Sequence, residues 1–530
     1  MTGRDFQLPG RSPVLAGNAM CATSHPLASE AAIAMLRGGG NAVDAAVTAA
    51  AVLAVVEPQM TGIGGDCFAI VARRDKAPTG INGSGRAPAA ATPQWYQLHG
   101  IEAIDRESVH AVTVPGAVDA WDRLLAEAGS IGLDKALAPA IRLAEDGFFV
   151  APRVGFDWRR GAEKLARDPG ARQFYLKDGK PYAAGDRVRL PALAKTLRTI
   201  AKKGRDAFYK GEIAEALVRH LNSLGGLHTL DDFAATTASP VKPVINPYRG
   251  VDMVEMPPNT QGITAQLMLN ILENFDLAAL VPMGAERLHL EMEAMRSAYR
   301  FRDQMIADPE AMRASVAEIL DKRLGRDLAA HIDMERCSAD LGPVRVPVGS
   351  DTVYLSVVDT DRMAVSFINS LFHTFGSGIC DPATGVLYQS RGSAFSLDPE
   401  HPNCIAPNKR PMHTLIPAMT MRDGRVELAY GVMGAAYQPV GHVHVATNVY
   451  DYVMDIQQAI DAPRLFFADG RLGLERGIPE AARAALAAKG HDVFVVDRPW
   501  GGGQGIMIDW ERGLLIGGSD PRKDGCALGF

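Results

Sequence analysis

The stretch TVYLSVVDTDRMAVSFINS, residues 352–370, is the part of the sequence that most constrains the fold. Residues 352–358 and 364–370 are rich in β-branched and aromatic side chains, and Asp-Thr-Asp-Arg at 359–362 separates the two runs. Two such runs joined by a short polar segment are typical of an antiparallel β-hairpin. The sequence therefore predicts a hairpin over this stretch.

The predicted hairpin brings two hydroxyl groups together. If the chain turns at residues 360–361, the numbers of facing residues add up to about 721 or 722. Thr352 then faces Asn369 or Ser370, at the point where loop-like sequence enters the sheet. From the pattern alone, a surface hairpin with two solvated hydroxyls is the favoured interpretation.

The rest of the chain mixes helical and strand-like patterns. At about 150 residues per domain, 530 residues correspond to about three domains or to one large layered fold, and no low-complexity linker divides the chain. Long helices mixed with antiparallel strands indicate layers of the α/β or α+β class. Helices are expected at 26–36, at 42–56 and through most of 115–335, and further strands at 251–256, 426–430 and 514–517.

Composition and charge exclude several classes of partner. Lys and Arg number 55 and Asp and Glu 61, which gives a net charge of −6, whereas nucleic-acid binding requires a basic surface. The longest mainly apolar stretch, residues 42–56, is shorter than the roughly 20 residues of a membrane span. Residues 1–13 lack the apolar core of a secretory signal, and six scattered cysteines without Cys-x-x-Cys predict free thiols. We therefore expect a cytoplasmic protein with neither nucleic acid nor membrane as partner.

The common catalytic motifs are missing from the sequence. His442 and His444 are two residues apart in a segment that reads as helical, so they would point to different sides, and His-Glu-x-x-His is absent. The serine-hydrolase elbow Gly-x-Ser-x-Gly is also absent. The glycine cluster at 61–66 lacks the Lys-Ser/Thr of a phosphate-binding loop, which favours tight backbone packing as its role. The sequence predicts no metal site and no cofactor.

Seven motifs, taken in order, make the sequence recognisable. With them it resembles the γ-glutamyltransferase family of N-terminal-nucleophile hydrolases over nearly its whole length. They are GGGNAVDAA at 38–46, GIGGD at 62–66, MPP at 256–258, ILENFD at 271–276, Thr352 followed by SVVD at 356–359, PNKRP at 407–411 and SDPR at 519–522.

The resemblance implies an α+β fold, the αββα four-layer sandwich of two stacked antiparallel sheets. It also implies a precursor that cleaves itself between Asp351 and Thr352. Residues 1–351 would form the large chain and residues 352–530 the small chain, which stay together as a heterodimer and one structural unit.

In this family the catalytic roles would fall on Thr352, Ser370 and a turn at Gly434-Ala435. Thr352 would be the nucleophile, activated by the α-amino group that cleavage frees. Ser370 would supply the second hydroxyl, which holds the nucleophile in place, in agreement with the hairpin pairing. Gly434 and Ala435 would donate backbone N–H groups to the oxyanion. The family usually has Gly-Gly there, and Ala resists a positive φ.

The substrate pocket departs from the glutamyl enzymes of the family. Their Asn aligns with Phe372, their Asp with Ala394 and their Ser-Ser pair with His413-Thr414. Their Arg aligns with Ser84, although Arg86 is two residues away, and another cation, Arg391, lies near the vacated Asp position.

This pattern is similar to the oxamate amidohydrolase branch and implies a small carboxylate-bearing amide as substrate, with Arg86, Phe372, Arg391, His413 and Thr414 as substrate-binding residues. An Arg fork suits a carboxylate, whereas an ordinary surface salt bridge is an equally good explanation of each Arg alone. A γ-glutamyl hydrolase or transferase with altered contacts and an uncleaved, non-catalytic binding protein are the alternatives.

Overall fold

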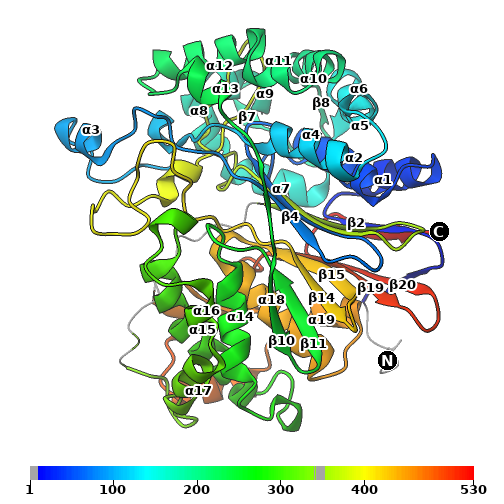
Figure 1. Cartoon of the computed structure of the whole chain (residues 1–530), viewed down its shortest axis with the longest axis vertical. Helices are drawn as coiled ribbons and strands as arrows, with labels where there is room; N and C mark the ends of the chain where they lie inside the picture. The colour runs from blue at the N-terminus through cyan, green and yellow to red at the C-terminus, as the bar shows by residue number, and fades with distance from the viewer. Residues whose placement is uncertain (1–9, 340, 342–351, 469) are drawn as a thin grey trace.

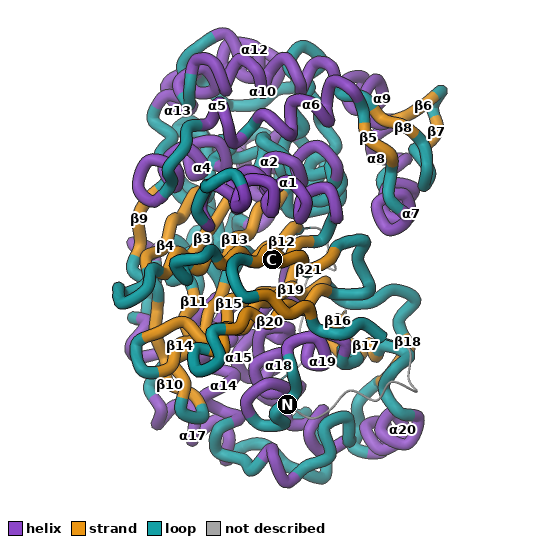
Figure 2. Tube along the Cα trace, turned by 90° about the vertical axis from the view of Figure 1, so that its right-hand side faces the viewer, coloured by secondary structure: helices purple, strands orange, loops and turns teal. Residues whose placement is uncertain are grey.

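Two seven-stranded antiparallel sheets lie face to face at the centre of the molecule (Figures 1 and 2). The computed structural model describes residues 10–339, 341, 352–468 and 470–530. In spatial order, sheet A comprises β1 (Val14–Ala16), β20 (Leu514–Ser519), β19 (Gly502–Asp509), β15 (Arg425–Met433), β14 (Ala418–Arg422), β11 (Val251–Glu255) and β10 (Val244–Tyr248). Sheet B comprises β21 (Cys526–Gly529), β2 (Met20–Thr23), β12 (Val353–Val358), β13 (Ala364–Ser370), β3 (Asp66–Ala72), β4 (Thr79–Gly83) and β9 (Ser239–Val241).

The predicted hairpin is confirmed as β12 and β13, in the centre of sheet B between β2 and β3. Val353 pairs with Asn369 and Val358 with Ala364, without a bulge, which is the second of the two predicted registers. Every residue of both strands is buried. The interpretation as a surface hairpin is therefore wrong, because both faces of this part of the sheet are covered.

Side chains alternate between the two faces of β12, and each face meets a different core. Tyr354 and Val358 point into the layer between the sheets, where they pack with side chains of sheet A such as Met419 and Ile506. Val353, Leu355 and Val357 point outward into the core beneath the helices. By the same alternation, Thr352, just before β12, has its side chain on the face toward the inter-sheet layer.

Helices cover the outer face of each sheet, which completes the αββα sandwich expected from the resemblance (Figure 2). Sheet B is covered chiefly by α1 (Pro26–Arg37), α2 (Ala42–Val56), α4 (Ala117–Ala128), α6 (Ala138–Asp146) and α10 (Pro191–Lys203), with α12 (Glu212–Ser223) beyond them. Sheet A is covered by α14 (Gly262–Leu272), α15 (Ala285–Met305), α18 (Gln438–Tyr450) and α19 (Ile456–Asp461), with α17 (Lys322–Ala330) and α20 (Glu480–Ala488) outside them.

Residues on both sides of position 352 contribute strands to both sheets. Sheet A takes β1, β10 and β11 from the part before it, and sheet B takes β2, β3, β4 and β9. Asp351, the residue before the expected cleavage point, lies outside the described residues.

All six cysteines are free, as predicted. No helix among the described residues has the length and apolar character needed to cross a membrane.

Helix α2 is buried along its whole length, so its N-terminus cannot rely on water for hydrogen bonds. The Asn41 side chain accepts from the backbone N–H groups of Val43 and Asp44, and Asp44 accepts in return from Asn41 N. The Asp44 carboxylate also accepts from the N–H and the hydroxyl of Ser130. This carboxylate therefore ties the helix to the loop after α4.

Replacing Asp44 by Ala is expected to lower the free energy of unfolding by about 2–4 kcal/mol, because it leaves several buried donors without an acceptor. For a chain of this length that corresponds to a fall in Tm of about 2–4 °C. Differential scanning calorimetry checks this, with Asp361→Ala, an exposed position, as the matched control. Equal Tm values for the two variants would contradict the assignment.

Candidate active site

The hydroxyls of Thr352 and Ser370 lie side by side, as the hairpin register requires. Their Oγ atoms are 3.1 Å apart, and both residues are 1% exposed. Ser370 Oγ also accepts a hydrogen bond from the backbone N–H of Phe372 at 2.8 Å. Thr352 stands immediately before β12 and Ser370 ends β13, so a rigid central hairpin fixes the separation of the two groups.

The glycine motif at 62–66 packs against the end of β13, which confirms the packing role predicted for it. A Cβ on Gly65 would lie 2.2 Å from the carbonyl oxygen of Ser370, and one on Gly64 would lie 2.2 Å from that of Leu387. Contacts this short exclude any side chain. The two glycines therefore let the loop approach both segments closely.

Asp66, which ends this motif, is a residue whose role the sequence did not indicate. It begins β3, directly opposite Ser370 in the ladder, and is fully buried. Its Oδ1 accepts from Gly85 N at 2.8 Å, Gly116 N at 3.3 Å and Gln389 Nε2 at 2.9 Å. Its Oδ2 lies 3.0 Å from His413 Nε2. Groups from four parts of the chain therefore converge on this buried carboxylate.

The predicted strand–turn–helix at the end of β15 is present. Gly434 has φ +131°, and Ala435 has φ +51° despite its Cβ. The turn leads into a short 3₁₀-helix (Ala435–Tyr437) and then α18. Backbone N–H groups at such a turn are suited to binding an anion. For a non-glycine residue the left-handed conformation costs about 1–2 kcal/mol, so the surroundings hold Ala435 in place.

Gln261, just before α14, is one of the groups that hold the turn. Its Nε2 donates to the carbonyl oxygens of Ala435 and Thr414, both at 2.9 Å. Its Oε1 accepts from Arg302 Nη1 at 3.3 Å. The side-chain amide therefore joins the turn to the segment that carries His413 and Thr414.

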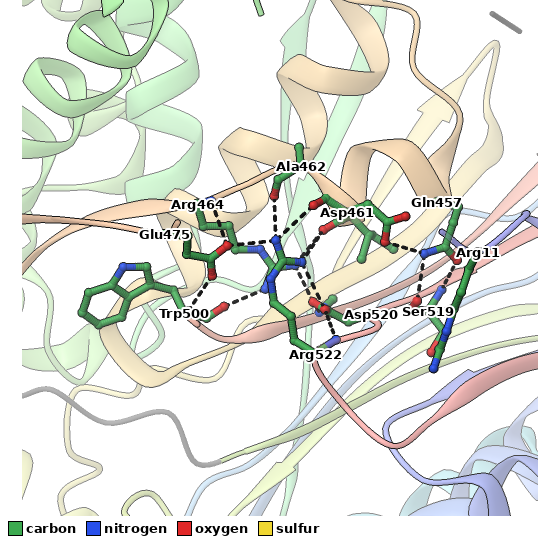
Figure 3. Close-up of polar contacts among 12 residues, drawn as sticks. Arg11, Gln457, Asp461, Ala462, Arg464, Glu475, Trp500, Ser519, Asp520 and Arg522 are labelled. Atoms are coloured by element: carbon green, nitrogen blue, oxygen red, sulfur yellow. Dashed lines mark hydrogen bonds and ion pairs between the residues drawn. The ribbon is translucent and has the colours of Figure 1, made fainter. Parts of the chain in front are cut away.

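A buried ionic network holds the segment that covers the same turn (Figure 3). Arg464 donates to the carbonyl oxygen of Trp500 and to Asp520, and Asp520 accepts from Arg522. These two arginines hold the pKa of Asp520 well below its usual range, although burial opposes them. Gly501, next to Trp500, lies so close to the turn that a Cβ on Gly434 would be 3.1 Å from its Cα. The SDPR motif at 519–522 thus holds the segment that packs against the Gly434-Ala435 turn.

Arg391 is a buried cation without an acidic partner. It is 1% exposed, its Cζ lies 3.6 Å from the centre of the Phe372 ring, and its Nη1 donates to Thr414 Oγ1 at 3.0 Å. Its Nε has no hydrogen-bond partner, and no Asp or Glu among the described residues forms an ion pair with it. Burial lowers the pKa of Arg391 to about 9, and the Asp66 charge opposes that shift. The guanidinium is therefore ready to bind an anion.

The other expected pocket residues divide into two groups. Phe372 and Thr414 touch Arg391, whereas both ring nitrogens of the buried His413 are engaged, because Nδ1 accepts from Leu415 N at 3.2 Å and Nε2 faces Asp66. Arg86 has other partners. Its side chain is 40% exposed, and its Nη1 donates to Asn408 O at 2.8 Å. The Arg86 guanidinium also lies 4.0 Å from the Asp308 carboxylate. Arg86 therefore forms the surface salt bridge that the sequence analysis gave as the other explanation.

Among the described residues, the structure brings together one group of possible metal ligands that the sequence did not indicate, His289, Glu293 and His491. His289 Nε2 must donate to the carbonyl oxygen of Asp333 at 2.9 Å, so its Nδ1 accepts from His491 Nε2 at 2.8 Å. Glu293 is paired with Arg296 at 2.8 Å. Both ring nitrogens of His289, His491 Nε2 and the Glu293 carboxylate are therefore engaged by protein groups. His442 and His444 point to different partners, Glu255 and Glu291, as predicted.

Comparison with known proteins agrees with this geometry. The sequence profile described as gamma-glutamyltranspeptidase matches residues 28–530. The chain belongs to the γ-glutamyltranspeptidase family. Within the family, it is 40% identical over 530 residues to the glutathione hydrolase-like YwrD proenzyme of Bacillus subtilis (strain 168), with 98% of this chain and 99% of that protein covered. It is 36% identical over 527 residues to the oxamate amidohydrolase proenzyme of Klebsiella pneumoniae, with 96% and 98% covered.

A solved structure shows the same fold. The cephalosporin acylase from Bacillus halodurans superposes with a TM-score of 0.93 at 36% sequence identity, and the alignment covers 100% of this chain and 99% of that one. The chain therefore has the N-terminal-nucleophile hydrolase fold and is a hydrolase or transferase of this family.

Replacing Ala435 tests the strain at the turn. Ala435→Gly is expected to keep or raise the free energy of unfolding, by up to about 1 kcal/mol, whereas Ala435→Val lowers it by about 1–2 kcal/mol because a branched Cβ clashes at this φ. Ala436→Gly is the matched control. Its backbone is not left-handed, so the same change should destabilise by about 0.5–1 kcal/mol. Thermal unfolding of the three variants checks the signs; the same sign for both glycine variants would contradict this account.

Proposed function

We propose that this protein is a self-processing, N-terminal-threonine amidohydrolase for a small carboxylate-bearing amide. The observation that carries the proposal is the position of Phe372 between two groups. Its backbone N–H donates a hydrogen bond to Oγ of Ser370, which neighbours Thr352. Its ring stacks on the guanidinium of Arg391, which has no acidic partner among the described residues. A nucleophile pair and an anion-binding cation therefore flank a single residue.

The chemistry follows from the freed N-terminus. Cleavage before Thr352 separates residues 1–351 from residues 352–530 and leaves an α-amino group next to the Thr352 hydroxyl. This amine takes the proton of Oγ1 while Oγ1 attacks the carbonyl carbon of the amide. The negative charge that develops on the carbonyl oxygen is stabilised by N–H groups of the Gly434-Ala435 turn. As the intermediate collapses, the amide nitrogen takes the proton from the N-terminal ammonium group and leaves as ammonia, and water then hydrolyses the Thr352 ester.

The charge of the pocket favours an anionic substrate. Burial lowers the pKa of His373 to about 3, and the positive charges of Lys164, Arg106 and Arg391 act in the same direction. A γ-glutamyl donor carries an α-ammonium group, and burying that charge without an anion would cost several kcal/mol. Ala394 and Phe372 offer no such anion. The relative named oxamate amidohydrolase supports this choice, whereas the one named glutathione hydrolase-like makes γ-glutamyl hydrolysis the second candidate.

A cytoplasmic location is part of the proposal, because six free cysteines suit a reducing compartment. The two chains are proposed to remain together as a heterodimer. Strands from both sides of position 352 in each sheet support this, and the curated relatives are named as proenzymes.

Self-cleavage is tested by mass. The purified protein is expected to give two fragments on a denaturing gel and in intact-mass spectra, and Thr352→Ala to give one, because the attacking hydroxyl is lost. Thr360→Ala, at the tip of the same hairpin, is the matched control and should cleave normally. Cleavage of Thr352→Ala at the same bond would refute the nucleophile assignment, and an uncleaved wild type would favour the non-catalytic binding protein.

Substrate choice is tested by steady-state kinetics. We expect kcat/KM for oxamate to exceed that for glutathione and γ-glutamyl anilides by at least about 100-fold. Arg391→Met is expected to lower kcat/KM for oxamate by about 100-fold. Ala394→Asp should also lower it, since it adds a like charge near the substrate. Arg323→Met, at a side chain 78% exposed, is the charge-matched control. Efficient turnover of glutathione with none of oxamate would refute this choice.

A further inference from the structure

We propose that Asp66 is the positioning residue that presents Arg391 to the substrate carboxylate and fixes its distance from the nucleophile. This inference rests on the proposed function and names a residue that determines its specificity. Asp66 does not form an ion pair with Arg391. It acts through the two segments that carry Arg391 and the hydroxyl that Arg391 touches.

The first connection runs through Gln389, two residues before Arg391. Gln389 Nε2 donates to Asp66 Oδ1 at 2.9 Å, and Gln389 N donates to the carbonyl oxygen of Gly64 at 3.0 Å. The next residue, Ser390, donates its N–H to the carbonyl oxygen of Leu371 at 3.0 Å. The backbone that leads to Arg391 is therefore fixed to the glycine motif and to the end of the central hairpin.

The second connection runs through His413 and Thr414. Burial lowers the pKa of His413 to about 3, with Arg391 acting in the same direction, so the ring is neutral at ordinary pH. Because Nδ1 accepts from Leu415 N, Nε2 carries the hydrogen and donates it to Asp66. The adjacent Thr414 then offers Oγ1 to Arg391 Nη1 at 3.0 Å. His413 therefore positions the pocket and has no ring nitrogen left for a substrate.

Separating the two charges by neutral side chains has a chemical purpose. A direct Asp–Arg fork would occupy the guanidinium and leave nothing for a ligand. At the distance set by Gln389 and His413–Thr414, the carboxylate still favours the charged form of Arg391, whose pKa it raises against burial. The same carboxylate lies opposite Ser370 in the ladder. One side chain thus sets the spacing between the hydroxyl pair and the cation.

Asp66→Asn tests the proposal with almost no change in shape. The amide keeps one oxygen for Gly85, Gly116 and Gln389, but its NH₂ would face the N–H of His413, so the second connection breaks. Loss of that connection and of the charge is expected to lower kcat/KM for oxamate by about 10–100-fold, mainly through KM. Oxamide, the uncharged isostere, should change less than about 3-fold. Binding of pyruvate, a non-hydrolysable carboxylate of the same shape, should weaken in parallel by calorimetry.

Two further variants keep the test decisive. Asp359→Asn is the matched control: it removes another buried carboxylate with three backbone donors, at the far end of the same hairpin, and the oxamate-to-oxamide ratio should not change. Gln389→Met removes the first connection without a change of charge. It should lower the ratio by about 3–10-fold, and it serves as the test if Asp66→Asn does not fold.

The outcomes separate this inference from the proposed function. If wild-type protein prefers oxamate to oxamide and Asp66→Asn lowers both rates equally, or leaves pyruvate binding unchanged, Asp66 has only a structural role and the inference fails. If wild-type protein neither hydrolyses oxamate nor binds pyruvate, the proposed function fails and this inference fails with it.

Discussion

Val353 faces Asn369 and Val358 faces Ala364 in an unbroken antiparallel ladder, and the arrangement of the site depends on that register. Side chains alternate along a strand, so a slip of one residue would turn the Thr352 and Ser370 side chains toward the helical layer. The slip would also force Val353, Leu355 and Val357 out of the core beneath the helices. Because both faces of the hairpin are buried, the hydrophobic cores on its two sides fix the position of a pair of hydroxyls.

From this hairpin a continuous set of buried polar contacts reaches the other parts of the site. Asp66, opposite Ser370, contacts His413; Thr414 contacts Arg391; and Gln261 joins Thr414 to the Gly434-Ala435 turn. Buried polar groups that are hydrogen-bonded to one another tend to impose one geometry, since a displacement would leave further donors or acceptors without a partner. The hydroxyl pair, the cation and the turn are thus positioned by hydrogen bonds, whereas the sheets are positioned mainly by apolar packing.

Local sequence patterns predicted much of the fold. The hairpin followed from two β-rich runs and a short turn, which left two registers open, and helix 42–56 was predicted over the longest mainly apolar stretch of the sequence. Burial of the hairpin could not be predicted, because apolar residues on both faces do not say what covers them. The site was harder still: Asp66, Gln261 and Gln389 meet their partners only across long sequence separations. The one available signal was an acidic residue at the start of the apolar run 66–72. The resemblance named Arg86 and Arg391 together as substrate-binding residues, and the sequence could not show that Arg86 has Asn408 and Asp308 as its partners.

Because the strands are interleaved, a cut at position 352 would leave two chains that cannot readily separate. Sheet B places β12 and β13 between β2 and β3, and sheet A places β20, β19, β15 and β14 between β1 and β11. Neither product could leave without breaking main-chain hydrogen bonds in both sheets at once. Separation would therefore require global unfolding, so dilution should not dissociate the pair and its subunits should not exchange between molecules. The cut would break one covalent bond and no other interaction, so the two polypeptides would unfold, lose activity and be degraded as a single molecule.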